Sequence, residues 1–270
     1  MVNVIITGVA GRMGGELIRA VRGDPGTRLV AGTIRARGPS AELSSRLAVP
    51  VDDSLQAAIA RGADVVIDFT TPQATVEHAA VCADAGKALV VGTTGLGAAE
   101  LEAIDLAARR IPIVIAPNMS VGMNLLFRLV EEAARTLPGF DAEVVEIHHR
   151  HKRDSPSGSA LRLGQAIAQG RGGGAAGELV HGRHGLVGER PAGPIGMHAV
   201  RGGDVAGDHT VFFLGSGERV ELTHRASSRE AFAAGAVRAA RWVVGREPGR
   251  YSMQDVLAGG GAGGEGRRST

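Results

Sequence analysis

The chain has 270 residues, 44% of them hydrophobic, so it is long enough to bury a core and to form two modest domains. Its net charge of +2 and aromatic content of 3% argue against nucleic-acid binding, which needs basic surface and stacking side chains. One cysteine, Cys82, excludes an internal disulfide, and no apolar run approaches the roughly 20 residues of a membrane span. We expect a globular, cytoplasmic protein that binds no membrane.

The beginning of the chain has the order of a dinucleotide-binding unit. A strand pattern at 2–7 is followed by the turn Gly8–Gly14, by a helical pattern, and by a second strand pattern at 28–34. Ala10 and Met13 occupy places where the usual GxGxxG fingerprint has glycine, and an ordinary tight turn is the alternative interpretation.

The end of the second strand pattern lacks the carboxylate that usually binds the ribose hydroxyls. Arg35 and Arg37 stand there instead, and guanidinium groups suit a ribose phosphate. This favours NADPH at least as much as NADH, although two solvated arginines on a loop would give the same pattern.

Strand and helix patterns continue to alternate through the first part of the chain. Strands are predicted at 64–69, 88–91 and 111–116, with helices between them, which is typical of a parallel, doubly wound sheet. Ligands bind such sheets at the carboxyl ends of the strands, where 69–71, 92–95 and 116–120 are polar or glycine-rich. A helix at 120–137, with Ser120 as its N-cap, leads out of this region.

The pattern changes after residue 139 and predicts a second domain. A strand at 140–147, a helix and a glycine-rich loop at 169–177 precede strand patterns at 195–201, 209–214 and 219–223, which we predict to be antiparallel. A helix at 228–244 returns to the first domain. We therefore predict a dinucleotide-binding domain at 1–119 and 228–258, a substrate-binding and oligomerisation domain at 120–227, and a disordered tail at 259–270.

Titratable side chains are concentrated between Glu146 and Ala160. His148, His149, His151 and Lys152 lie at the end of a predicted strand, and a turn leads from them into a helix that starts near Ser157–Ser159. A helix start binds anions, so the segment offers proton donors, a cation and a cradle for a carboxylate. A solvated basic face is the alternative; a zinc site is disfavoured because no cysteine pair or HExxH helix accompanies the histidines.

Together these residues resemble the dihydrodipicolinate reductase family, also called 4-hydroxy-tetrahydrodipicolinate reductase. The resemblance runs from about Asn3 to Leu257, and the His-His-Arg-His-Lys block is its specific part. It implies a Rossmann-type doubly wound parallel sheet, a second α+β domain with a mostly antiparallel sheet, and a homotetramer. The implied activity is NAD(P)H-dependent reduction of a small dicarboxylate in diaminopimelate and lysine biosynthesis.

The resemblance also implies roles for individual residues. His148 is the expected proton donor and Lys152 assists it, while His149, Gly158 and Ser159 are expected to bind substrate. Met119 stands where phenylalanine is also common and is expected to pack on the nicotinamide; Arg35 stands where many relatives are acidic. No metal is expected. The expected cofactor-binding residues are Gly8, Val9, Ala10, Gly11, Arg12, Met13, Arg35, Gly92, Thr93, Thr94, Ala116, Pro117, Asn118 and Met119.

Two other classes of protein remain open at this point. A dehydrogenase of the aspartate or homoserine kind would share the first domain but not the His-His-x-His-Lys turn. A non-catalytic dinucleotide sensor would bind the cofactor without needing His148 and Lys152.

Overall fold

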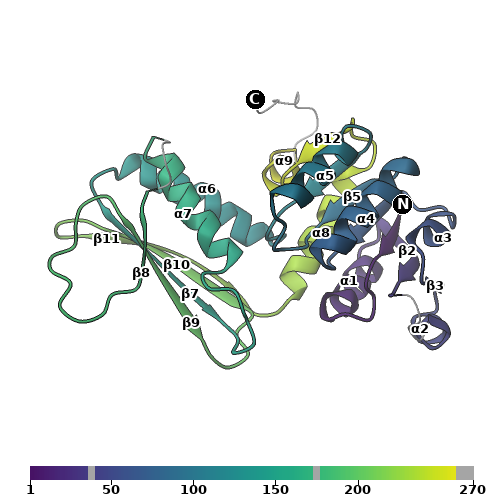
Figure 1. Ribbon diagram of the computed structural model, residues 1–270, viewed down its shortest axis with the longest axis horizontal. Helices are drawn as coiled ribbons and strands as arrows, with labels where there is room; N and C mark the ends of the chain where they lie inside the picture. The colour runs from purple at the N-terminus through teal and green to yellow at the C-terminus, as the bar shows by residue number, and fades with distance from the viewer. Residues whose placement is uncertain (36–39, 173–176, 260–270) are drawn as a thin grey trace. The chain divides into compact units, whose positions relative to one another are not determined.

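The structure is a computed structural model in which residues 1–35, 40–172 and 177–259 are described (Figure 1). Its contacts divide the chain into two units: Met1–Val121 together with the chain from Glu230, and Gly122–Arg229. Each unit has its own sheet and its own apolar core. Arg37, the middle of the predicted glycine-rich loop and the predicted tail from 260 lie outside the described residues.

The described part of the first unit holds a seven-stranded sheet whose pairings are all parallel, in the order β12-β6-β5-β4-β1-β2-β3. Its strands are β1 (Val2–Ile6), β2 (Thr27–Thr33), β3 (Val51–Asp52), β4 (Val65–Asp68), β5 (Ala88–Val91), β6 (Pro112–Ile115) and β12 (Gly249–Tyr251). The helices are α1 (Arg12–Gly23), α2 (Ser40–Leu47), α3 (Leu55–Ile59), α4 (Pro72–Asp84), α5 (Ala98–Ala108), α8 (Glu230–Val243) and α9 (Met253–Ala258).

Both faces of this sheet are covered, which explains why its strands are continuously apolar. Val4 and Ile6 point into one core, with side chains from α1 and α8, whereas Ile5 points into the other, with side chains from α3, α4 and α5. Cys82 is fully buried in the second core, where it packs as a small apolar side chain. The parallel, doubly wound architecture predicted from the alternation is confirmed.

Several short elements of the first unit are not predicted by the sequence pattern. The strands β3 and β12 have two and three residues, and the helices α3 and α9 have five and six. Elements of this length are too short to show a hydrophobic period, so only tertiary pairing defines them.

The second unit has a five-stranded sheet among its described residues, in the order β11-β10-β7-β9-β8. Two helices pack on one face of this sheet, and their apolar side chains share one core with those of the strands (Figure 1). The elements are α6 (Val121–Thr136), β7 (Asp141–His148), α7 (Gly158–Gly170), β8 (Leu179–His181), β9 (Ile195–Arg201), β10 (Gly207–Leu214) and β11 (Arg219–Ala226).

One predicted pairing in this unit is wrong. The strand at 195–201 was expected in an antiparallel group, but β9 runs parallel to β7, and β8 runs parallel to β9. The antiparallel pairings are those of β10 with β7 and with β11. The crossover through α7 returns the chain in the same direction, and hydrophobic alternation carries no information on strand direction. The predicted loop also begins too early, since α7 continues to Gly170.

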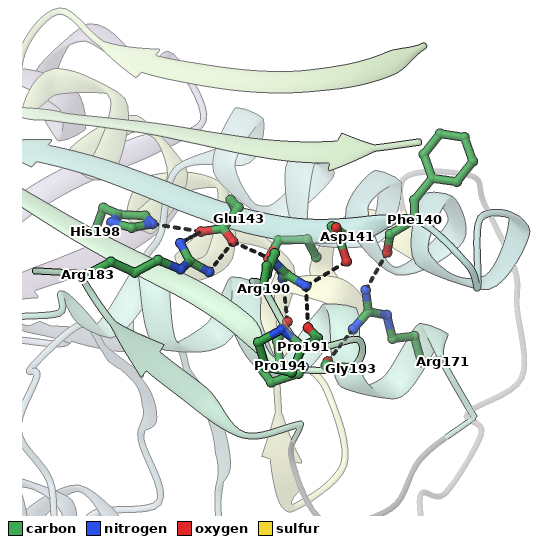
Figure 2. Close-up of polar contacts among 11 residues, drawn as sticks. Phe140, Asp141, Glu143, Arg171, Arg183, Arg190, Pro191, Gly193, Pro194 and His198 are labelled. Carbon is green, nitrogen blue, oxygen red and sulfur yellow. Dashed lines mark hydrogen bonds and ion pairs between the residues drawn. The ribbon is translucent and has the colours of Figure 1, made fainter. Parts of the chain in front are cut away.

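The face of the second sheet that α6 and α7 leave uncovered carries an ion-pair cluster around Glu143 (Figure 2). Arg183 donates to both oxygens of Glu143 at 2.8 and 3.1 Å, Arg190 donates at 3.0 Å, and His198 Nε2 lies 2.7 Å away. Arg190 also donates to Pro194 O at 2.7 Å. These bonds tie the segment between β8 and β9 to β7.

Candidate active site

Strand β7 delivers two titratable side chains to its helix-covered face. Buried and half-buried residues alternate along the strand, so Glu146 and His148 point the same way as Val144. Glu146 is 1% exposed and His148 is 8% exposed. The strand ends at His148, and α7 begins ten residues later at Gly158 with Ser157 as its N-cap.

The Glu146 carboxylate is bonded by four donors. Its Oε2 contacts His148 Nδ1 and accepts from Arg201 Nη1 at 2.9 Å. Its Oε1 accepts from Arg201 Nη2 at 2.8 Å and from the Ser157 backbone N–H at 3.0 Å. Burial raises the pKa of this carboxyl, but the hydrogen bonds from His148, Arg201 and Ser157 outweigh it and lower the pKa to about 2. Glu146 is therefore an anion at neutral pH.

His209 reaches the same place from β10. Its Nε2 lies 3.3 Å from Ser157 Oγ, and the same hydroxyl accepts from Ala160 N–H at 3.1 Å as the cap of α7. Burial, with the nearby His148 charge adding to it, lowers the pKa of His209 to about 3. His209 is thus a neutral ring that supports the start of α7 from behind.

The remaining histidines and the lysine occupy the turn after β7. The backbone N–H of His149 donates to Val205 O at 2.8 Å, and Gly202 N–H donates to His148 O at 3.0 Å. Lys152 Nζ lies 2.9 Å from Asp154 Oδ2, with 22% of its side chain exposed. Lys152 is therefore held in the turn and remains accessible to a bound anion.

The first turn of α7 lies next to this group. Gly158 is exposed at the first helical position, where the N–H has no intrahelical acceptor, and Ser159 is 8% exposed. His148, His149, Lys152, Gly158 and Ser159 thus all lie between the end of β7 and the first turn of α7. Their roles stay predictions.

The glycine turn of the first unit has the shape of a dinucleotide cradle. Gly8 has a φ of +64°, and Gly11 is the N-cap of α1. A Cβ at Gly14 would lie 2.6 Å from Val9 O and 2.7 Å from Gly8 O, so no side chain fits where the turn meets the helix. A tight glycine turn that opens a helix N-terminus fits the pyrophosphate of a dinucleotide.

The neighbouring strand ends pack tightly against this turn. A Cβ at Gly8 would lie 3.2 Å from the Thr70 methyl group, and one at Gly92 would lie 2.1 Å from the Phe69 ring. Thr93 Oγ1 accepts from Thr70 N–H at 3.0 Å. Because β1, β4, β5 and β6 are parallel neighbours, the predicted cofactor segments that follow them all lie at one edge of the sheet.

Not every predicted cofactor residue presents its side chain at that edge. Val9 is 3% exposed and packs against Gly32, so it could contact a ligand only through its backbone. Met119 is 1% exposed within the core, which is against the expected packing of its side chain on a nicotinamide. Ala10, Arg12 and Arg35 are exposed.

Three residues of these networks are missed by the sequence analysis. Arg201 and His209 lie more than 50 residues from Glu146 and Ser157, and nothing local links them to the histidine cluster. Asp68, fully buried at the end of β4, accepts from Thr7 and Thr70 at 2.7 and 2.6 Å beneath the glycine turn. A charged residue at the end of an otherwise apolar strand is the signal that marks Asp68.

No group of three or more His, Cys, Asp and Glu side chains in residues 1–35, 40–172 and 177–259 is arranged to hold a metal ion. In the same ranges, no helix combines the length and the apolar character needed to cross a membrane.

Two family models match the chain, one for each half. The model described as "Dihydrodipicolinate reductase, N-terminus" matches residues 2–119, and the model described as "Dihydrodipicolinate reductase, C-terminus" matches residues 122–257. Together they cover nearly all of the described chain.

Curated relatives match over almost their full length. Proteins named 4-hydroxy-tetrahydrodipicolinate reductase from Anaeromyxobacter dehalogenans and Myxococcus xanthus are each 52% identical to the chain, over 95% of it and 98% of the relative. One from Alkalilimnicola ehrlichii is 53% identical, over 94% of the chain and 98% of the relative.

Solved structures agree with the family models. A dipicolinate-bound dihydrodipicolinate reductase from Paenisporosarcina sp. TG-14 has a TM-score of 0.72 and 27% identity, and the match covers 93% of this chain and 97% of that one. GenD2 from gentamicin A biosynthesis, solved with NAD, has a TM-score of 0.65 at 15% identity, covering 95% and 90%; it shares the fold.

Proposed function

The chain belongs to the dihydrodipicolinate reductase family, and we propose that it reduces 4-hydroxy-tetrahydrodipicolinate to tetrahydrodipicolinate with His148 as the proton donor. That it is an NAD(P)H-dependent oxidoreductase of diaminopimelate and lysine biosynthesis follows from its family. The single observation that carries the assignment of residues is the buried bond between His148 and Glu146 beside the α7 N-terminus.

The first unit supplies the cofactor site in this proposal. The turn from Gly8 to Met13 and the N-terminus of α1 hold the pyrophosphate, while the segments 92–94 and 116–119 surround the nicotinamide end. When bound there, the reduced nicotinamide supplies the hydride. Arg35, with Arg12 helping, meets the ribose phosphate of NADPH.

The second unit supplies the substrate site. The substrate is a small ring with two carboxylates, and the first turn of α7 offers backbone N–H groups at Gly158 and Ser159 to one of them. Lys152 offers an ammonium group, which has to exchange its contact with Asp154 for one with the ligand. His149 contributes a further polar side chain in the same turn.

His148 completes the reaction. An imidazole is a common general acid, and the resemblance implies that the proton donor is His148. The chain's own contribution is to hold that ring, to bind the dicarboxylate beside it and to keep a neutral His209 behind it.

A coupled assay tests the assignment. The product of the preceding synthase would be offered with NADPH and with NADH, and cofactor oxidation followed by absorbance. Aspartate semialdehyde and homoserine serve as control substrates. Turnover of these instead would favour an amino-acid dehydrogenase, and cofactor binding without any turnover would favour a sensor.

We also propose a cytoplasmic homotetramer that assembles through the uncovered face of the second sheet. Ile147 and Val200 are paired on that face, and Val200 and Leu214 are 45% and 37% exposed. The Glu143 cluster lies on the same face, so the face is mixed, and its exposed apolar side chains favour contact with a second copy of the same sheet. Light scattering after size-exclusion chromatography measures the oligomer, and a charged residue in place of Val200 should lower its mass.

A further inference from the structure

We infer that Glu146 is a positioning residue that fixes the orientation and the tautomer of His148, and that Arg201 anchors it. The inference rests on the proposed role of His148 and extends it to two residues that do not touch the substrate. Glu146 is 1% exposed, and its contacts come from β7, from β9 and from the cap of α7.

The four donors on Glu146 determine which atom of His148 can exchange a proton. An ionised carboxylate is only an acceptor and offers about four lone-pair sites, so Arg201, Ser157 N–H and His148 together use them all. The nitrogen that faces Oε2 must therefore carry hydrogen. This assigns the permanent proton to Nδ1 and leaves Nε2 as the atom that takes up and delivers the reacting proton.

The surroundings of Nε2 agree with that division. Gly207 of β10 lies beside this nitrogen, since a Cβ there would be 3.0 Å from His148 Nε2 and 3.4 Å from Cδ2. Glycine at this point keeps a side chain away from the reacting nitrogen. The ring of His209 packs edge to face against His148, with centroids 5.1 Å apart, and limits its rotation.

Glu146 also links the proton donor to the substrate cradle. Its Oε1 binds the backbone N–H of Ser157, the cap of α7, and Arg201 donates to Asp154 O at 2.7 Å in the turn that carries Lys152. One buried carboxylate thus fixes the distance between His148, the turn and the α7 N-terminus. The low pKa of its carboxyl, about 2, means that Glu146 remains an anion and does not itself deliver the proton.

Glu143 provides a matched control on the same strand. It is also bonded by arginines and a histidine, and hydrogen bonds likewise lower its pKa to about 2 against the effect of burial. It points to the opposite face of the sheet, however, and its partners Arg183, Arg190 and His198 are separate from the histidine cluster.

The decisive variant is Glu146→Gln. We expect turnover to fall roughly 10- to 100-fold, as for other outer partners that orient a functional histidine, with little change in the KM for substrate or in cofactor affinity. In a His148→Gln background the same substitution should lower turnover far less, because the residue it positions is already absent. Glu143→Gln should leave turnover nearly unchanged.

A spectroscopic readout separates positioning from a merely structural effect. In protein with ¹⁵N-labelled histidine, the His148 signals, identified by their loss in His148→Gln, should report hydrogen on Nδ1 in the wild type and in Glu143→Gln. Glu146→Gln should give a mixture of tautomers, and Glu146→Asp should restore the Nδ1–H form and part of the turnover. If Glu146→Gln fails to fold, Glu146→Gln combined with Arg201→Gln removes both charges and gives the same readouts.

Three results would overturn the inference: unchanged turnover in folded Glu146→Gln, an equal loss in the presence and absence of His148, or an unchanged tautomer. Failure of the proposed function looks different. In that case His148→Gln alone would keep its turnover, while the tautomer of His148 in Glu146→Gln would still decide whether Glu146 positions the ring.

Discussion

His148 and His209 meet edge to face on the helix-covered side of the second sheet, with ring centroids 5.1 Å apart and an interplanar angle of 78°. The two rings have different partners. His148 has a carboxylate at Nδ1, whereas the Nε2 of His209 lies 3.3 Å from the neutral Ser157 hydroxyl, and burial lowers the pKa of His209 to about 3. The pair therefore consists of one ring with a carboxylate partner and one that burial keeps neutral.

The neutral state of His209 predicts a pH dependence of stability. Because its pKa is lower in the folded state than the ordinary 6.5, the unfolded chain binds more protons between the two values, and stability rises with pH there. The contribution of His209 is complete above pH 6.5 and falls by about 1.4 kcal/mol per pH unit below it. Urea unfolding between pH 4.5 and 7 should show a shallower slope for His209→Gln. His151→Gln, an exposed control, should keep the wild-type slope; equal slopes in all three proteins would refute a buried neutral His209.

Removal of His148 should affect turnover and spare cofactor binding. If His148 delivers the proton, His148→Gln should lower kcat by roughly 10²–10⁴, the usual effect of losing a general acid. NADPH affinity, measured by fluorescence titration, should stay near the wild-type value, because the cofactor residues belong to the other unit. An unchanged kcat would remove His148 from the mechanism.

Lys152→Ala should weaken substrate binding. The ammonium group is held by Asp154 in the turn that leads to α7, where it can supply a counter-charge to a carboxylate. Loss of a charge-assisted bond of about 1.5–3 kcal/mol corresponds to a rise in KM of roughly 10- to 150-fold. Arg153→Ala removes an exposed cation from the same turn and should change KM little. An effect of Lys152→Ala confined to the KM for NADPH would show that Lys152 is misplaced in our proposal.

Arg35→Ala should change the choice of cofactor. Arg35 is exposed after β2, so its bond to a ribose phosphate is partly solvated, and we expect kcat/KM with NADPH to fall on the order of 10-fold. NADH should be used nearly as before, because no ribose phosphate is lost. Arg109→Ala is the control, because Arg109 is exposed and precedes β6, at the amino ends of the strands. We would abandon phosphate recognition by Arg35 if both cofactors were affected equally.

Gly14→Ala should damage the dinucleotide cradle. Its Cβ would lie 2.6 Å from Val9 O, and a backbone atom can move away only if the glycine turn changes shape. Overpacking of this kind costs about 1–3 kcal/mol, and the affinity for both NADPH and NADH should fall. Gly15→Ala is the control, since its Cβ would have only the flexible Arg19 side chain within 4.0 Å. Calorimetric titration that gave equal affinities for the two variants would show that the turn does not contact the cofactor.

Much of the secondary structure and of the histidine cluster can be predicted from the sequence, because each of these patterns lies within a single segment. The sequence predicts five strands of the first sheet, the glycine turn and the His148–Lys152 block. Apolar runs, glycines and clustered histidines can be recognised within one segment, without knowledge of tertiary partners. The helix at Gly158 is predicted for the same reason, as its cap and its apolar spacing lie within one segment.

Only the tertiary structure decides the partners of those residues. The direction of β9 depends on the crossover through α7. The neutral state of His209 depends on its burial beside Ser157, which lies 52 residues away in the sequence. Arg201 reaches Glu146 because β7 and β9 lie in parallel register, with His148 opposite Arg201. Local sequence therefore determined which titratable side chains gather in one segment, whereas long-range strand pairing determined which of them are buried, charged and held in place.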